Sequence, residues 1–108
     1  MAANELLAER IRDALGDRGP IVEKRMFGGI CFMLNGNMLC GTSNDRFMFR
    51  VGKNAEAEAM RKPGAEVVEM GGRVMKGFIW VDADAAIEAG LEGWIDLAAA
   101  YVGALPPK

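Results

Sequence analysis

Two adjacent glycines, Gly28 and Gly29, are the feature that most constrains how this chain folds. They lie between two stretches of strand-like composition, 22–27 and 30–34. A glycine pair in such a place marks backbone that side chains would obstruct. We expect either a bulge that lets one strand cross another closely, or a notch whose exposed N–H groups bind an anion. Both interpretations place the pair within a sheet.

The dipeptide Asn35-Gly36 is the strongest hairpin signal in the chain, because both positions of a tight two-residue turn favour these residue types. If the two residues alone form the loop, the residues on either side pair across the ladder. The expected pairs are Met33 with Met38, Phe32 with Leu39, and Cys31 with Cys40.

Periodic apolar residues and turn residues predict the remaining elements. Extended structure begins at 22–27, and a further strand at 46–51 alternates between apolar and polar side chains. Its apolar face carries Phe47, Phe49 and Val51, and its other face carries Arg46, Met48 and Arg50. Strands at 67–70 and 78–81 flank a Gly71-Gly72 turn, with 73–77 in their loop.

Three helices are expected, each with its own start and stop residues. The first helix lies between Asn4, its expected N-cap, and Gly16. The second helix covers 55–61, with Asn54 as its cap. The third helix is predicted by one apolar stripe through 84–105, in which Gly90 and Gly93 favour a late start or a bend.

These elements predict a two-layer α+β fold, an antiparallel sheet packed on helices in the order α-β-β-β-α-β-β-α. A length of 108 residues, 51% of them hydrophobic, is sufficient for one core, so we expect a single domain over 1–108. The N-terminus lacks a signal-type pattern, and no apolar stretch approaches the roughly 20 residues that cross a bilayer. We therefore expect a cytoplasmic protein without a membrane partner.

The residue types exclude several kinds of chemistry. The chain has no histidine and two cysteines, too few for a zinc site, and its single serine lacks a histidine to activate it. We expect no catalytic residue, no metal and no cofactor. Cys31 and Cys40 form either a cross-strand redox pair or two reduced, packed thiols.

The formal net charge of −2 argues against direct DNA binding, which depends on a strongly basic face. Within 18–62, however, eight Lys or Arg stand against four Asp or Glu. This imbalance leaves open a modest basic patch or an ordinary solvated surface.

Several of these motifs occur together in a recognisable order. They are Arg25-Met26-Phe27-Gly28-Gly29, the Asn35-Gly36 hairpin, the segment Gly72-Arg73-Val74-Met75-Lys76-Gly77, and the closing helix with Trp94. In this combination the chain resembles the TfoX N-terminal domain family over nearly its whole length. The family is named for bacterial regulators of natural competence genes, in which a second, helical domain follows. The resemblance implies a short stand-alone member and the same antiparallel fold; Cys31 departs from a glycine common in the family.

We therefore expect a non-enzymatic regulatory or protein-interaction domain, resembling the N-terminal domain of competence regulators. Its partner would be another protein, and a homodimer is one way to cover the apolar hairpin, which is rich in methionine. The alternative is a small-ligand or nucleic-acid binding module that uses the Gly28-Gly29 turn and nearby basic residues. The candidate binding residues are Arg25, Met26, Phe27, Gly28, Gly29, Arg46, Arg50 and Lys76.

Overall fold

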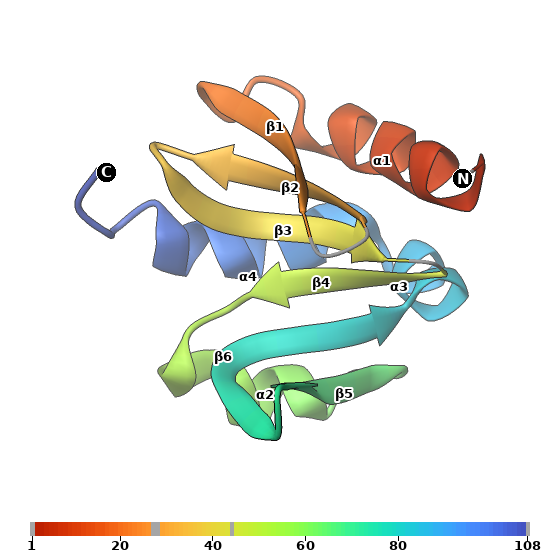
Figure 1. The fold of residues 1–108 in the computed structure, drawn as a ribbon, viewed down its shortest axis with the longest axis vertical. Coiled ribbons are helices and arrows are strands. Elements are labelled where there is room, and N and C mark those ends of the chain that lie inside the picture. The colour runs from red at the N-terminus through yellow and green to blue at the C-terminus, as the bar shows by residue number, and fades with distance from the viewer. Residues whose placement is uncertain (1, 27–28, 44, 108) are drawn as a thin grey trace.

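A single antiparallel sheet organises the computed structural model, which describes residues 2–26, 29–43 and 45–107. The described strands run in the spatial order β1-β2-β3-β4-β6-β5 (Figure 1). Their bounds are β1 Ile21–Met26, β2 Gly29–Leu34, β3 Asn37–Ser43, β4 Arg46–Arg50, β5 Ala65–Met70 and β6 Arg73–Asp82.

Four α-helices pack against one side of this sheet, which confirms the predicted α+β class. In Figure 1 the long helix α4 runs behind the central strands, while α1 lies near β1 and β2. The bounds are α1 Ala2–Leu15, α2 Glu56–Met60, α3 Ala83–Ala89 and α4 Leu91–Val102, with a 3-10 turn η1 at Lys53–Ala55. None of the helices among the described residues is long and apolar enough to span a membrane.

The order of elements is more detailed than the sequence indicated. The described part of the extended segment expected at 22–27 belongs to a full strand, β1, which ends at Met26, so four strands precede α2. The closing helix divides into α3 and α4 at Gly90, whose φ of 102° and ψ of 108° lie outside the helical region. The expected bend is thus a complete break, because only glycine adopts this backbone conformation readily.

Both predicted asparagine caps are wrong. Helix α1 already begins at Ala2, so Asn4 lies within it, in keeping with the high helix propensity of the preceding alanines. Asn54 lies inside η1, and α2 follows with Ala55 at its N-cap and no capping side chain. The predicted stop is confirmed, since α1 ends at Leu15 and Gly16 has a φ of +54°.

The segment 73–77, expected to be a loop, belongs to strand β6. Gly71 and Gly72 alone form the turn, with φ values of 59° and 79°. Two positive φ values suit the tight turn of a hairpin, and Met70 pairs directly with Arg73. The loop prediction was too long because a two-residue turn lets pairing start at once.

The Asn35-Gly36 hairpin forms as predicted, with φ values of 54° and 83° in its two turn residues. Met33 faces Met38, which confirms the first expected pair. The next two pairs are wrong, because a bulge shifts the register beyond Met33. The observed partners are Phe32 with Cys40 and Cys31 with Gly41.

The bulge has a packing reason. Leu39 and Cys40 are consecutive, yet both are fully buried in the core between the sheet and the helices. A regular strand would send them to opposite faces, whereas one extra residue lets both face the core. Met38, just before them, packs on the opposite side of the sheet.

The shifted register also separates the two cysteines. Cys40 lies in the helix-side core, while the Cys31 Sγ lies 3.5 Å from the place where a Cβ on Gly41 would stand, on the other side of the sheet. Burial raises the pKa of both thiols, so the reactive thiolate is disfavoured. This geometry corresponds to two reduced, packed thiols.

We expect the folded protein to resist intramolecular disulfide formation. After native treatment with diamide, alkylation in urea should modify both Cys31 and Cys40, as measured by intact mass. The same oxidation of the urea-unfolded chain should link them. A disulfide formed within the native chain would contradict the observed register.

Candidate functional site

The structure does not bring the predicted binding residues into one site. Arg25 lies on β1 and points toward α1, whereas Arg46 and Arg50 lie on β4 and Lys76 lies on β6, across the sheet. Phe27 and Gly28 fall outside the described residues, and Met26 is described only as the last residue of β1.

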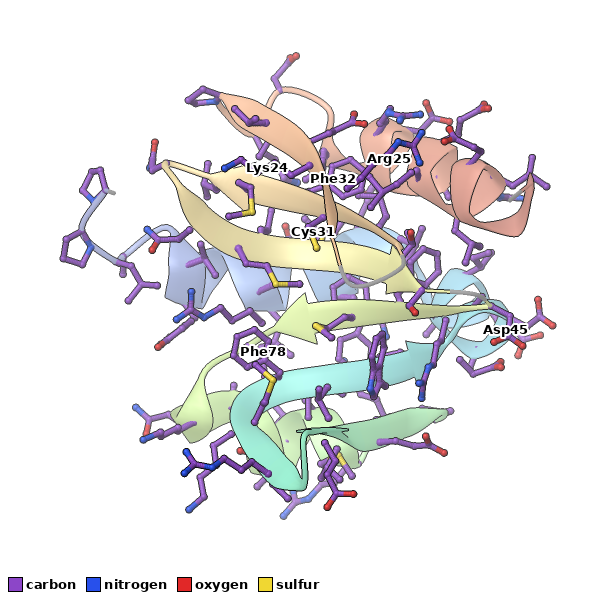
Figure 2. The ribbon with its side chains drawn as sticks, in the orientation of Figure 1. Lys24, Arg25, Cys31, Phe32, Asp45 and Phe78 are labelled. Atoms are coloured by element: carbon purple, nitrogen blue, oxygen red, sulfur yellow. The ribbon has the colours of Figure 1, made fainter. Side chains whose placement is uncertain are left out.

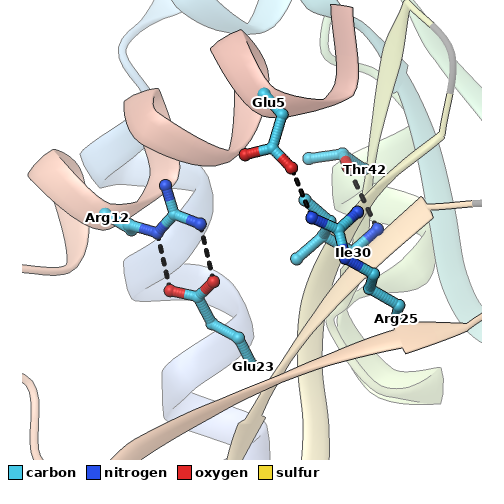
Figure 3. A network of polar contacts seen from close by, with 6 residues as sticks. All are labelled: Glu5, Arg12, Glu23, Arg25, Ile30 and Thr42. Atoms are coloured by element: carbon cyan, nitrogen blue, oxygen red, sulfur yellow. Dashed lines mark hydrogen bonds and ion pairs between the residues drawn. The ribbon is translucent and has the colours of Figure 1, made fainter. Parts of the chain in front are cut away.

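Arg25 takes part in a pair of contacts that fasten α1 to β1 (Figure 3). Its guanidinium donates to Glu5 at 2.6 Å, and Arg12 donates to both carboxylate oxygens of Glu23 at 2.6 and 2.7 Å. The hydrogen bond from Arg12 lowers the pKa of Glu23, and that from Arg25 lowers the pKa of Glu5. Arg25 therefore has a structural partner already.

Gly29 allows strands β2 and β3 to approach each other closely, as one of the two interpretations of the glycine pair predicts. A Cβ built on Gly29 would stand 1.7 Å from the carbonyl oxygen of Thr42 and 2.8 Å from its carbon. On the same stretch the N–H of Ile30 donates to the Thr42 Oγ1 at 3.3 Å. Any side chain at Gly29 would push β2 away from β3.

A different feature stands out as a candidate site, the side of the sheet opposite the helices. A second apolar cluster forms there, separate from the main core. We call this surface the open face; it is built by Met48, Val68 and Trp80, with Met38, Met75 and Phe78 packed around them. In Figure 2 sulfur atoms lie along the front of the sheet, where Cys31 and Phe78 are labelled.

The alternation of β4 and its pairing with β6 build the centre of the open face. Met48 lies opposite Trp80, and Arg50 opposite Phe78, as the predicted alternation of β4 requires. Trp80 is only 9% exposed, although no described helix covers it, because Arg46 lies over its ring at 4.0 Å from the centroid. The central side chains thus shield one another.

One end of the open face is cationic. The Arg50 guanidinium carbon lies 5.3 Å from the Phe78 ring centroid and 5.6 Å from that of Tyr101 on α4. Two rings within about 6 Å hold a cation by their electron-rich faces. Arg50 belongs to none of the ion pairs among the described residues. It is an oriented charge without a carboxylate partner there.

A close backbone crossing brings two lysines to the same end. The Gly77 carbonyl accepts hydrogen bonds from the N–H groups of Val51 at 2.8 Å and Gly52 at 3.1 Å. Lys53, which follows Gly52 at the start of η1, and Lys76, which precedes Gly77 in β6, are both exposed. The Glu56 carboxylate also meets this crossing, where it accepts from the Gly77 N–H at 3.1 Å. We call Arg50, Lys53 and Lys76 the cationic end.

The other end of the open face is acidic. Asp45, Glu66 and Asp82 line a shallow pocket together with Arg46 and Trp80. Arg46 contacts Glu66 only at 3.8 Å, and Asp82 also caps α3 by accepting from the Ala85 N–H at 3.1 Å. Three carboxylates surround one arginine, so this end is net negative. Figure 2 shows Asp45 and Phe78 at opposite ends of the face.

The candidate metal ligands and nucleophiles of the chain can be placed on this fold. Among residues 2–26, 29–43 and 45–107, no group of three or more Cys, Asp or Glu side chains is placed to hold a metal ion. Both thiols have raised pKa values, which weakens them as nucleophiles. A groove between α1 and the α3–α4 junction is lined by Arg10, Asp13 and Glu92, but it lacks a focused charge.

Sequence reasoning proposed Arg46, Arg50 and Lys76 as binding residues but did not predict which side chains lie beside them. The sequence placed Trp80 and Phe78 in a strand but did not indicate which side of the sheet they occupy. It placed Tyr101 on the apolar stripe of the last helix. Counting alternation backward from Asp82 would have placed both β6 aromatics on the same face of the sheet. The position of Tyr101 depends on how α4 packs, which no local pattern contains.

The structure therefore defines a small α+β domain with helices on one side of its sheet and, on the other, a methionine-rich face that none of the described helices covers. The chain matches the TfoX N-terminal domain over residues 13–101 and belongs to that family. A search of curated proteins and a search of solved structures each gave no match.

Loss of the Arg12–Glu23 contact should destabilise the protein in a pH-dependent way. Because the folded-state pKa of Glu23 is lowered, the contact stabilises the fold above the ordinary value of 4.5 and is lost as the pH falls through the folded pKa. Arg12→Gln should cost about 0.5–1 kcal/mol at pH 7, the range for half-exposed pairs, and almost nothing at low pH. Urea unfolding measures both.

Arg10→Gln is the matched control, since Arg10 lies on the same helix and forms no ion pair with the described residues. A cost for Arg12→Gln that does not change between neutral and acidic pH would contradict the assignment to Glu23.

Gly29→Ala should be strongly destabilising. The added Cβ would collide with the Thr42 backbone, which cannot move without opening the sheet, so we expect a loss of at least about 2 kcal/mol in urea unfolding. Gly93→Ala is the control, because Gly93 lies in α4 with nothing near its Cβ position. There alanine should add roughly 0.5–1 kcal/mol. Equal effects at the two sites would disprove the close crossing.

Proposed function

We propose that this protein is a non-enzymatic regulatory domain that acts by binding another protein through the open face. One observation carries the proposal: a broad sheet surface of methionine and aromatic side chains is covered by no helix among the described residues. Flexible thioethers adapt to a partner's shape, and contiguous apolar surfaces mark interaction sites.

The two charged ends support the same proposal. A row of apolar side chains provides affinity for a partner but does little to fix the partner's orientation, whereas charges at fixed positions determine how the partner is aligned on the face. Arg50 is held between Phe78 and Tyr101 without an internal carboxylate, so a partner's carboxylate can bind it at little conformational cost. Family membership adds to the argument, since the family is named for regulators of competence genes.

The alternative is a small-ligand or nucleic-acid module that uses the glycine turn and the basic residues. Arg25 is engaged by Glu5, and Gly29 is occupied by its contact with Thr42, so neither supports a shared site with Lys76. The acidic end of the open face would also repel a polyanion. These facts favour a protein partner.

Site-specific photo-crosslinking in the native cells tests the proposal. A benzophenone amino acid at Met38, on the open face, should give a protein adduct, while the same probe at Glu9, exposed on α1, should not. Excess unlabelled protein should suppress the Met38 adduct. Equal labelling at the two positions, or none at Met38, would count against the open face.

An NMR amide titration with duplex DNA at low ionic strength completes the test. We expect no localised shifts. Salt-sensitive shifts of Arg50 and Lys76 would instead favour the nucleic-acid alternative and overturn the proposal.

A further inference from the structure

A row of paired residues crosses four strands of the open face. Cys31 of β2 pairs with Gly41 of β3, and Gly41 pairs with Met48 of β4. Trp80 of β6 continues the row as the partner of Met48. Paired residues send their side chains to the same side of a sheet. Because Gly41 has no side chain, a gap is left between Cys31 and Met48, two strand spacings of ~4.8 Å apart.

The bulge in β3 brings a second methionine to this gap. Since the two residues after Met38 both face the helix-side core, Met38 becomes the neighbour of Gly41 along the open face. Figure 2 shows the Cys31 sulfur at the front of the sheet, with other sulfur atoms on the strands beside it. One small cavity is lined by Cys31, Met38, Gly41, Thr42, Ser43, Met48 and Trp80.

The cavity has room for one atom-sized ligand. Its volume is about 10 Å³, close to the smallest space that holds a single water molecule. Its lining is mostly apolar, which gives a water molecule few hydrogen-bond partners. A thiol and two thioethers are instead the soft ligands that soft metal ions prefer. The size and the chemistry of the lining therefore favour a single soft ion.

We propose that this cavity, which we call the sulfur site, binds one Cu(I) ion through the sulfur atoms of Cys31, Met38 and Met48. Trp80 forms an aromatic wall of the same cavity. The flexible methionine side chains give the ion a way in, since Met38 is only half-buried. The inference goes beyond the proposed function and does not depend on it, because the ion binds to the chain alone.

Charge balance selects a monovalent ion. Cu(I) displaces the thiol proton of Cys31, the proton passes to the solvent, and no electron is transferred. One positive charge replaces another, so the site with its two neutral thioethers stays neutral. Zn(II) would leave a positive charge uncompensated among apolar side chains, which is costly. The expectation of no metal rested on the lack of histidine, which a site of thiolate and thioether ligands does not require.

Anaerobic titration with Cu(I) against a competing chelator is the first test. Native mass spectrometry should find one Cu(I) per chain. In protein labelled with carbon-13 at the methionine methyl groups, the signals of Met38 and Met48 should shift, while that of Met60 on α2 should not. Absence of a bound ion, or shifts that leave out Met38 and Met48, would overturn the inference.

Two cysteine variants provide a matched comparison. Cys31→Ala should weaken Cu(I) binding at least about tenfold, because even groups that only orient the ligands of a metal are worth that much. Cys40→Ala removes the buried thiol on the other side of the sheet and should leave the Cu(I) affinity unchanged. Equal losses in the two variants, or no loss in Cys31→Ala, would contradict the sulfur site.

Methionine variants test the other two ligands. Met38→Leu and Met48→Leu nearly conserve side-chain volume and remove the sulfur, so the fold should be retained. Each should also lose at least about tenfold in Cu(I) affinity, whereas Met60→Leu should bind as the wild type does. Amide NMR spectra establish that each variant is folded. Folded Met38→Leu and Met48→Leu proteins with wild-type affinity would disprove the proposed ligand set.

The crosslinking experiment distinguishes this inference from the proposed function. Cu(I) binding by the purified chain, with no Met38 adduct in cells, supports the sulfur site and overturns the proposed function. A Met38 adduct in cells, with no Cu(I) binding by the purified chain, does the reverse.

Discussion

The packing of every helix on one side of the sheet determines the rest of this structure. At its centre Phe49 of β4 stacks on Trp94 of α4, with ring centroids 5.1 Å apart and planes 12° from parallel. Trp94 is 1% exposed and Phe49 fully buried, so this contact joins the middle strand to the closing helix. Once that side holds the core, the other side of the same strands has only its own side chains for cover.

The local irregularities follow from the same requirement. The bulge in β3 sends both Leu39 and Cys40 into the helix-side core, at the cost of regular pairing with β2. The break at Gly90 turns α4 away from the line of α3. In each case burial of apolar side chains outweighs the regularity of one element, because burial contributes more free energy than one ladder hydrogen bond.

Features set by neighbouring residues could be predicted from the sequence, and features set by distant ones could not. The Asn35-Gly36 turn and the alternation of β4 depend on adjacent residues, and both are confirmed. The register of Cys31 depends on how the helices fill the core, so counting from the turn gave the wrong partner. For the candidate site, Arg50 was proposed from its charge, but its position beside Tyr101 depends on the packing of α4, which the sequence pattern does not contain.

The polarity of the open face arises from a small asymmetry in β4. Its two outward arginines are four residues apart and both lie on aromatic rings, but the ion pairs among the described residues include Arg46 and not Arg50. The carboxylates that line a pocket with Arg46 are placed by the fold itself: Asp82 must stand at the end of β6 to cap α3, and Glu66 follows from the pairing of β5. At the other end, the Glu56 carboxylate accepts a hydrogen bond from the Gly77 backbone N–H. Requirements of the fold therefore leave one arginine neutralised and the other available to a partner.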